Sequence, residues 1–184
     1  MAELRVAILD SGFALPAIAA CAFVPRADGG VDMAEAENDR FGHGSAVAAI
    51  IAGLAPGAKL LNGQIFGPAG GTSAAAAAAG LDWACGEGAD IVTMSFGLRA
   101  NRGILHASVA KTAAVMLGAS PARGDPVYPS AYAPVLRITG DARCAAGEIS
   151  HLATEQADFG ACVRGPGGDG ASMAVAHAAG LLAA

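Results

Sequence analysis

The sequence is poor in aromatic and charged residues and contains no long run of uncharged apolar side chains. Aromatic residues make up 5% of the 184 residues and charged residues 15%, whereas hydrophobic residues make up 54%. Disordered chains combine low hydrophobicity with high charge, so this composition excludes intrinsic disorder. No uncharged apolar stretch reaches the roughly 18–20 residues that span a bilayer, which argues against a membrane partner. The net charge of −5 gives no electrostatic support for nucleic-acid binding.

Metal-ligating patterns are also missing from the sequence. The chain has four cysteines, and no two of them form a CxxC motif. No pair of histidines has the spacing of a zinc site, so we expect no metal site. The first residues lead directly into an apolar run without the segments of a signal peptide, which predicts a cytoplasmic protein with reduced thiols.

Short apolar runs alternate with longer small-residue runs along the chain. Alternation of this kind predicts an α/β fold of three layers, with a mostly parallel sheet and helices on both faces. The length fits one domain over residues 1–184. Strands are expected at residues 5–9, 59–66, 90–96, 115–117 and 135–139, and helices at residues 44–53, 74–86, 104–113 and 172–184.

Residues 25–40 differ from the rest of the chain because acidic side chains and glycine crowd together there. The segment contains Asp28, Asp32, Glu35, Glu37 and Asp39. A solvated loop explains this composition, and a docking surface for a basic partner is the alternative.

Three polar residues stand where a parallel sheet places reactive groups, beyond the carboxyl ends of strands or at the start of a helix. Asp10 follows the first strand, His43 begins a buried helix, and Ser172 begins the last helix. A hydroxyl, an imidazole and a carboxylate are the groups that nucleophilic acyl transfer needs. Taken singly, they could be a turn aspartate, a capping or packed histidine and an N-cap serine. The order Asp, His, Ser is one of the known chain orders of this triad, which favours catalysis.

These residues and their surroundings resemble the subtilisin-like serine proteases over nearly the whole chain. By this resemblance, Asp10 is the orienting acid, His43 the general base and Ser172 the nucleophile, and Ser95, Phe96 and Gly97 line the substrate cleft. No cofactor is implied. The motifs that carry the resemblance are Val6-Ala-Ile-Leu-Asp-Ser-Gly12, His43-Gly-Ser-Ala-Val-Ala48, Gly53-Leu-Ala-Pro-Gly-Ala-Lys-Leu60, Asp90-Ile-Val-Thr-Met-Ser-Phe-Gly97, Tyr128-Pro-Ser-Ala-Tyr-Ala-Pro-Val135 and Gly170-Ala-Ser-Met-Ala-Val-Ala-His-Ala-Ala-Gly180.

The sequence also departs from the family pattern at several positions. Where the family has an oxyanion asparagine, this chain has Leu117-Gly-Ala-Ser-Pro121, which makes Ser120 the expected oxyanion donor. Ala46 stands in place of a second histidine, and the segment before Ser172 lacks the usual hairpin. We therefore expect a truncated subtilisin-like core. Its small size suggests a dedicated processing enzyme, similar to the protease that removes a leader peptide during maturation of quinohemoprotein amine dehydrogenase.

Two functions follow from these features. The first is a serine endopeptidase of narrow specificity, acting on a peptide or protein precursor that a partner protein could present. The second is a weak or inactive pseudoprotease that binds peptides, which the missing oxyanion asparagine favours. An unrelated α/β hydrolase is disfavoured because the chain has no Gly-x-Ser-x-Gly motif.

Overall fold

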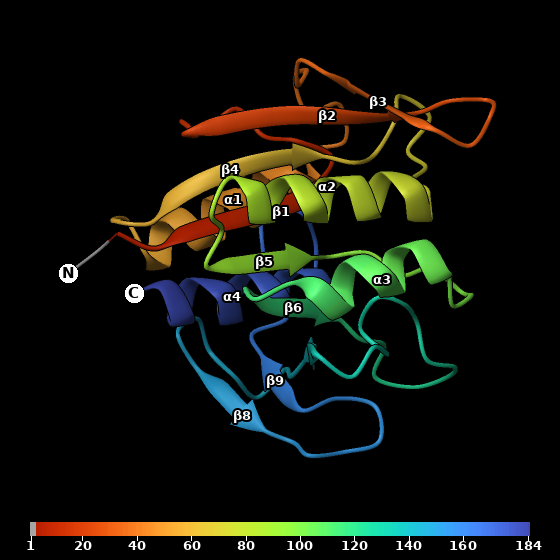
Figure 1. Cartoon of the computed structure of the whole chain (residues 1–184). Coiled ribbons are helices and arrows are strands. Elements are labelled where there is room, and N and C mark those ends of the chain that lie inside the picture. Colours follow the sequence, from red (N-terminus) through yellow and green to blue (C-terminus); the bar gives the residue numbers. More distant parts are fainter. Residues whose placement is uncertain (1–2) are drawn as a thin grey trace.

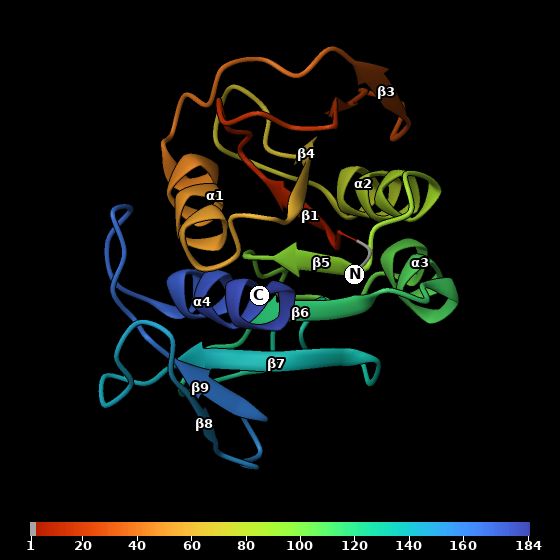
Figure 2. The ribbon, with the colours of Figure 1, turned by 90° about the vertical axis from the view of Figure 1, so that its left-hand side faces the viewer.

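The computed structural model describes residues 3–184, which fold into one nine-stranded sheet with two helices on each face (Figures 1 and 2). The strand order is β3-β2-β4-β1-β5-β6-β7-β9-β8. The elements are β1 (Arg5–Asp10), β2 (Ala19–Pro25), β3 (Val31–Ala34), α1 (His43–Leu54), β4 (Lys59–Gln64), α2 (Ala74–Gly86), β5 (Ile91–Met94), α3 (Gly103–Lys111), β6 (Val115–Ala119), β7 (Val135–Gly140), β8 (Ile149–His151), β9 (Phe159–Ala161) and α4 (Ala171–Ala183).

The sheet is parallel from β2 to β9 and ends in an antiparallel strand at each edge. β1 lies in the middle and pairs in parallel with β4 and β5, whereas β3 and β8 pair antiparallel with β2 and β9. Because all its central strands run the same way, their carboxyl ends meet at one edge. Asp10, the last residue of β1, lies at this edge.

Two apolar cores fill the space between the sheet and its helices. Side chains of a strand point alternately to opposite faces. Accordingly, Val6 and Ile8 of β1 pack in the core under α1 and α4, and Ala7 and Leu9 pack in the core under α2 and α3. Figure 2 shows the two helix pairs on opposite sides of the strands. The sheet is therefore buried on both faces, as its continuous apolar strands predict.

The structure confirms the expected α/β fold of three layers with a mostly parallel sheet. Helix α2 has the bounds that the alanine run predicts, and Ser73 is its N-cap, accepting a hydrogen bond from the backbone N–H of Ala76 at 3.0 Å. The sequence did not indicate the strands β2, β3, β8 and β9.

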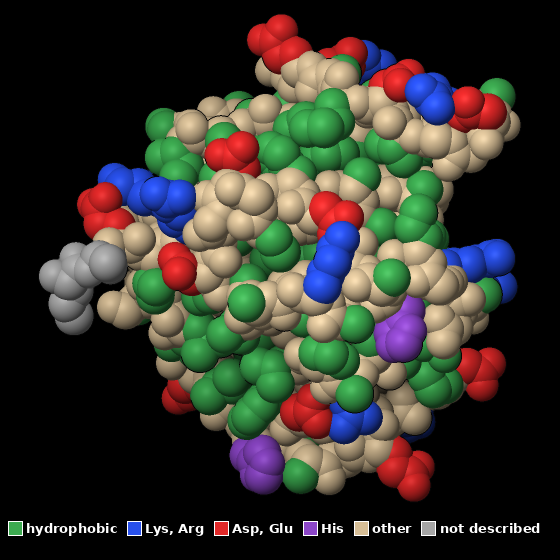
Figure 3. Space-filling model, in the orientation of Figure 1, with side chains coloured by type: hydrophobic (Ala, Val, Ile, Leu, Met, Phe, Trp, Pro, Cys, Tyr) green, Lys and Arg blue, Asp and Glu red, His purple; other side chains and the backbone are tan. Residues whose placement is uncertain are grey.

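The expectation of a solvated loop over residues 25–40 was wrong in part, because β3 lies within this segment and pairs with β2. Several of its acidic side chains are also neutralised locally: Arg26 pairs with Asp28 and Asp32, both at 3.1 Å, and Arg40 pairs with Glu37. Figure 3 shows acidic and basic side chains beside one another along the upper edge of the molecule, where this hairpin lies. Less free negative charge is left for a basic partner than the sequence suggests.

No helix within residues 3–184 is long and apolar enough to cross a membrane. Over the same residues, the structure groups no three histidine, cysteine, aspartate or glutamate side chains in a way that could hold a metal ion.

Candidate active site

Asp10 is a buried carboxylate at the carboxyl end of β1. Its exposed fraction is 1%, and its Oδ1 atom accepts hydrogen bonds from the backbone N–H of Ser11 at 2.7 Å and from the Ser11 hydroxyl at 3.3 Å. Its Oδ2 atom has no hydrogen-bond partner among the described residues. Burial and these specific contacts distinguish Asp10 from an exposed turn aspartate.

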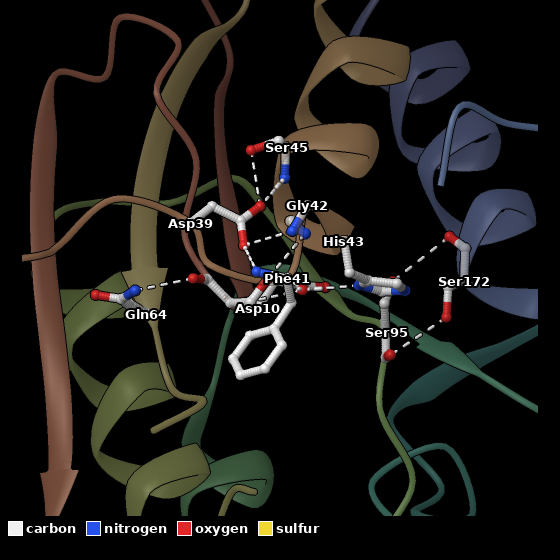
Figure 4. A network of polar contacts seen from close by, with 11 residues as sticks. Asp10, Asp39, Phe41, Gly42, His43, Ser45, Gln64, Ser95 and Ser172 are labelled. Atoms are coloured by element: carbon white, nitrogen blue, oxygen red, sulfur yellow. Dashed lines mark hydrogen bonds and ion pairs between the residues drawn. The ribbon is translucent and has the colours of Figure 1, made fainter. Parts of the chain in front are cut away.

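His43 is the first residue of α1, and its ring meets Asp10 (Figure 4). The distance between His43 Nδ1 and Asp10 Oδ1 is 2.8 Å. Asp10 Oδ1 already accepts a hydrogen bond from the Ser11 amide, so we assign the hydrogen of this contact to Nδ1, which leaves Nε2 free to accept a proton. The hydrogen bond to Asp10 raises the pKa of His43, and partial burial of the ring opposes this effect. His43 does not cap α1, because the N-cap residue is Gly42.

The start of α1 lies very close to the turn that follows β1. The backbone N–H of Gly44 donates a hydrogen bond to the Ser11 hydroxyl at 3.0 Å. A Cβ atom at position 44 would overlap the carbonyl oxygen of Gly12. Glycine at position 44 therefore allows the approach that brings His43 to Asp10.

Asp39 belongs to the same network, although the sequence analysis assigns it no role beyond membership of the acidic segment. Its carboxylate accepts four hydrogen bonds: from the backbone N–H groups of Phe41 at 3.0 Å, Gly42 at 2.9 Å and Ser45 at 2.9 Å, and from the Ser45 hydroxyl at 2.7 Å. Burial opposes ionisation of Asp39, but the hydrogen bonds from Ser45 and its neighbours hold the pKa of Asp39 below its ordinary value. An aspartate four residues before a histidine at a helix start is the signal that could have identified it.

Ser172 lies in the first turn of α4 and faces Ser95, which directly follows β5 (Figure 4). The Ser172 hydroxyl donates to the carbonyl oxygen of Ser95 at 3.3 Å, and the Ser95 hydroxyl donates to the carbonyl oxygen of Ser172 at 3.5 Å. The N-cap of α4 is Gly170, so Ser172 is not a capping residue. In Figure 4 the ring of His43 lies between the carboxylate of Asp10 and the pair formed by Ser95 and Ser172.

A cleft of about 500 Å³ opens beside His43. Its walls include Asp10 and His43 and all three residues that the resemblance assigns to substrate binding, Ser95, Phe96 and Gly97. The rings of Phe41, Phe66 and Phe96 give the cleft a largely apolar lining. Phe41 is 49% exposed and packs over Gly70.

Ser120, the expected oxyanion donor, is not brought to this cleft. Its hydroxyl donates to the carbonyl oxygen of Gln156 at 2.6 Å, and it lines a separate cavity together with Ser130, Arg137 and Gln156. A hydroxyl has one hydrogen to donate, so this contact occupies the group that would stabilise an oxyanion. His177 likewise lies outside the network, with Nε2 donating to the carbonyl oxygen of Arg164 at 3.0 Å.

A family model described as "Subtilase family" matches residues 2–184. The chain belongs to the subtilase family. It is 29% identical over 151 residues to alkaline elastase YaB of Bacillus sp. (strain YaB), which covers 73% of this chain and 38% of the elastase. It is 28% identical over 222 residues to minor extracellular protease Epr of Bacillus subtilis (strain 168), covering 98% of this chain and 32% of that protease. This subtilase thus spans about a third of the length of these curated relatives.

Solved structures show the same fold at low sequence identity. S41 psychrophilic protease superposes with a TM-score of 0.69 at 20% identity, over 99% of this chain and 76% of that structure. A lanthipeptide protease gives a TM-score of 0.71 at 14% identity, over 98% of this chain and 72% of that structure. Sphericase gives a TM-score of 0.68 at 17% identity, over 98% of this chain and 76% of that structure. The subtilase fold is therefore established for residues 3–184.

Proposed function

We propose that this subtilase is a serine endopeptidase that uses Asp10, His43 and Ser172. The observation that carries the proposal is the 2.8 Å contact between His43 Nδ1 and the buried carboxylate of Asp10. A buried carboxylate that holds one imidazole nitrogen fixes the tautomer whose other nitrogen can act as a base. Membership of the subtilase family supports the same roles.

In the proposed reaction, His43 Nε2 takes the proton of the Ser172 hydroxyl while Oγ attacks the scissile carbonyl carbon. The proton then passes from His43 to the leaving amine, and a water molecule later releases the acyl group from Ser172 with His43 again as base. The backbone N–H groups in the first turn of α4, around Ser172, are positioned to stabilise the oxyanion because no carbonyl within the helix accepts from them. For this step the Ser172 hydroxyl leaves its hydrogen bond with Ser95.

The substrate in this proposal is a dedicated peptide or protein precursor, whose leader segment is removed during maturation. The cleft is lined by three phenylalanines and by no lysine or arginine, which favours an apolar segment of substrate. A lanthipeptide protease has this fold, and by analogy we propose a peptide substrate for this chain as well. An enzyme of narrow specificity should digest an unfolded general substrate such as casein far more slowly than its cognate precursor substrate.

A peptide-binding pseudoprotease is the second candidate. Two observations favour it: the hydroxyl of Ser120 is committed to Gln156, and the hydroxyl of Ser172 is committed to Ser95. Such a protein would retain the cleft and bind peptides without cleaving them.

Labelling with a fluorophosphonate separates the two candidates, because the reagent needs an activated serine. We expect the wild-type protein to be labelled once, at Ser172, and the Ser172→Ala variant to remain unlabelled. The Ser120→Ala variant is a matched control that removes a serine hydroxyl outside the cleft, and its labelling should equal that of the wild type. A folded wild-type protein that resists the reagent would establish the pseudoprotease instead. Mass spectrometry of candidate peptides with the same variants then identifies the cleaved bond.

We also propose a cytoplasmic location. All four cysteines are free thiols, and Cys21, Cys144 and Cys162 are buried, in keeping with a reducing compartment. Fractionation of cells that express the gene from its own locus tests this location, and recovery of the protein in the medium would contradict it.

A further inference from the structure

We propose that Asp39 is a positioning residue for this active site, which holds the backbone on both sides of His43 so that the imidazole stays between Asp10 and the cleft. This inference rests on the proposed peptidase activity and adds a residue to it. Asp39 makes no hydrogen bond to His43 and does not itself line the cleft, so its effect is transmitted through the backbone that it binds, including that of Phe41 in the cleft wall.

The hydrogen bonds of Asp39 surround His43 in sequence. Its Oδ1 atom accepts from the amides of Phe41 and Gly42, which precede the histidine, and its Oδ2 atom accepts from the amide and hydroxyl of Ser45, which follows it. In the same turn, the amide of Gly44 donates to the hydroxyl of Ser11. The backbone around the proposed base is thus tied to two side chains, one of which is adjacent to Asp10.

The local sequence explains why this turn needs an external acceptor. The N-cap position of α1 is Gly42, which has a φ of 75° and no side chain to accept hydrogen bonds from the first amides. Four amides at the start of a helix lack acceptors within it. Asp39 supplies acceptors from outside the helix, and its negative charge lies at the positive end of the helix dipole.

A helix cap alone would stabilise the fold without affecting the chemistry, so the electrostatic surroundings of His43 matter. The charged groups near enough to raise the pKa of His43 are Asp10 from β1 and Asp39 from the segment before α1. The walls of the cleft from β4 to α2 and after β5 are formed by Phe66, Gly70, Thr72 and residues 95–98, which carry no charge. Loss of the Asp39 charge should therefore lower the pKa of His43, in addition to displacing its ring.

The test is the Asp39→Asn variant, which keeps the shape of the side chain and removes its charge and one pair of acceptor sites. We expect kcat to fall by about 10- to 100-fold, because a base displaced by a fraction of an ångström transfers protons poorly. KM should stay within about twofold, since residues 95–97 of the cleft are untouched. The pH midpoint of kcat/KM should move to lower pH. Asp32→Asn removes an exposed acid of the same segment and should leave all three quantities unchanged.

A second measurement does not depend on turnover. NMR titration of His43 in the Ser172→Ala background should give a lower pKa when Asp39→Asn is added, and an equal pKa in both proteins would overturn the proposal. If Asp39→Asn does not fold, Ser45→Ala takes its place, because it removes the 2.7 Å hydrogen bond and retains the charge. We then expect kcat to be lower by about threefold or more with KM unchanged, and a wild-type kcat would overturn the proposal.

Failure of this inference is distinguishable from failure of the proposed function. An active wild-type protein whose Asp39→Asn variant keeps both kcat and the pH midpoint would refute the role of Asp39 and leave the peptidase standing. An inactive wild-type protein would refute the peptidase, and the NMR titration would still report whether Asp39 acts on His43.

Discussion

His43 lies close to two carboxylates, and their effect on its titration determines how activity should depend on pH. The hydrogen bond to Asp10 raises the pKa of the ring, partial burial opposes this, and the charges of Asp10 and Asp39 add to the increase. The proposed base must be neutral to accept a proton. We therefore expect kcat/KM to rise with pH and to reach half of its maximum above about 6.5, the ordinary pKa of histidine. A pH profile of peptide cleavage between pH 5 and 9 measures this, and a midpoint below 6.5 would contradict it.

The same raised pKa of His43 should make the free energy of unfolding fall as the pH rises, whereas activity increases. Protonated His43 is stabilised in the folded protein by Asp10, so its contribution is fully present below the unfolded pKa of about 6.5. The contribution is lost as the pH rises through the folded pKa, which is the range in which activity appears. Urea unfolding of the Ser172→Ala protein should show the decrease, and an Asp10→Asn version should lack it. An equal slope in both proteins would show that another group is responsible.

For Ser120, the family motif predicts an oxyanion donor, whereas the structure directs its hydroxyl away from the cleft. Its hydroxyl donates to Gln156 and not toward the cleft, so Ser120→Ala should leave kcat/KM within about twofold and lower the free energy of unfolding by about 1 kcal/mol. Loss of a true oxyanion donor would instead lower kcat by about 10²–10³, a magnitude measured in subtilisin. Steady-state kinetics with a peptide substrate separate the two results.

At the residue scale, the sequence predicted that Asp10 and His43 lie together, but it did not indicate the hydrogen bonds of Asp39 beside them. Asp10 and His43 stand in glycine-containing motifs of distinctive composition, and the structure brings them to 2.8 Å. Asp39 was hidden among other acidic residues, because its role depends on where its carboxylate points and composition does not report that. The direction of the Ser120 hydroxyl depends on Gln156, which is 36 residues away, and no local pattern could show it.

At the scale of elements, local propensity predicted the helices and the inner strands well. The bounds of α2 follow from an alanine run with a serine N-cap, whereas β8 and β9 have three residues each and exist through their pairing with one another and with β7. β3 occupies a polar segment whose strand character comes from pairing with β2. Short edge strands therefore depend on tertiary pairing that a single sequence does not reveal.

The packing of α1 against the turn after β1 gives a prediction for the element as a whole. Gly44→Ala places a methyl group against the carbonyl oxygen of Gly12, so α1 must move away from β1. We expect a destabilisation of about 1–3 kcal/mol and loss of most of the activity, because the contact between His43 and Asp10 depends on this approach. Gly53→Ala is the matched control in the same helix, where an added methyl group meets no atom within 4 Å. It should keep full activity and raise stability by about 0.5–1 kcal/mol, and equal behaviour of the two variants would refute the close-approach argument.

At the scale of the whole molecule, the two cores share the central strands of one sheet. Alternate side chains of β1 pack into each core, so unfolding of either core would expose one face of this strand. We expect residues 1–184 to unfold as a single cooperative domain. Trp83, the single tryptophan, packs against Phe23 with ring centroids 5.8 Å apart and reports on the core beneath α2, whereas far-ultraviolet circular dichroism reports on all four helices of the described residues. In urea, with Ser172→Ala used to prevent self-digestion, the two signals should give one midpoint. Fluorescence that changes at a different urea concentration from the helical signal would mean that the layer of α1 and α4, which carries His43 and Ser172, unfolds separately.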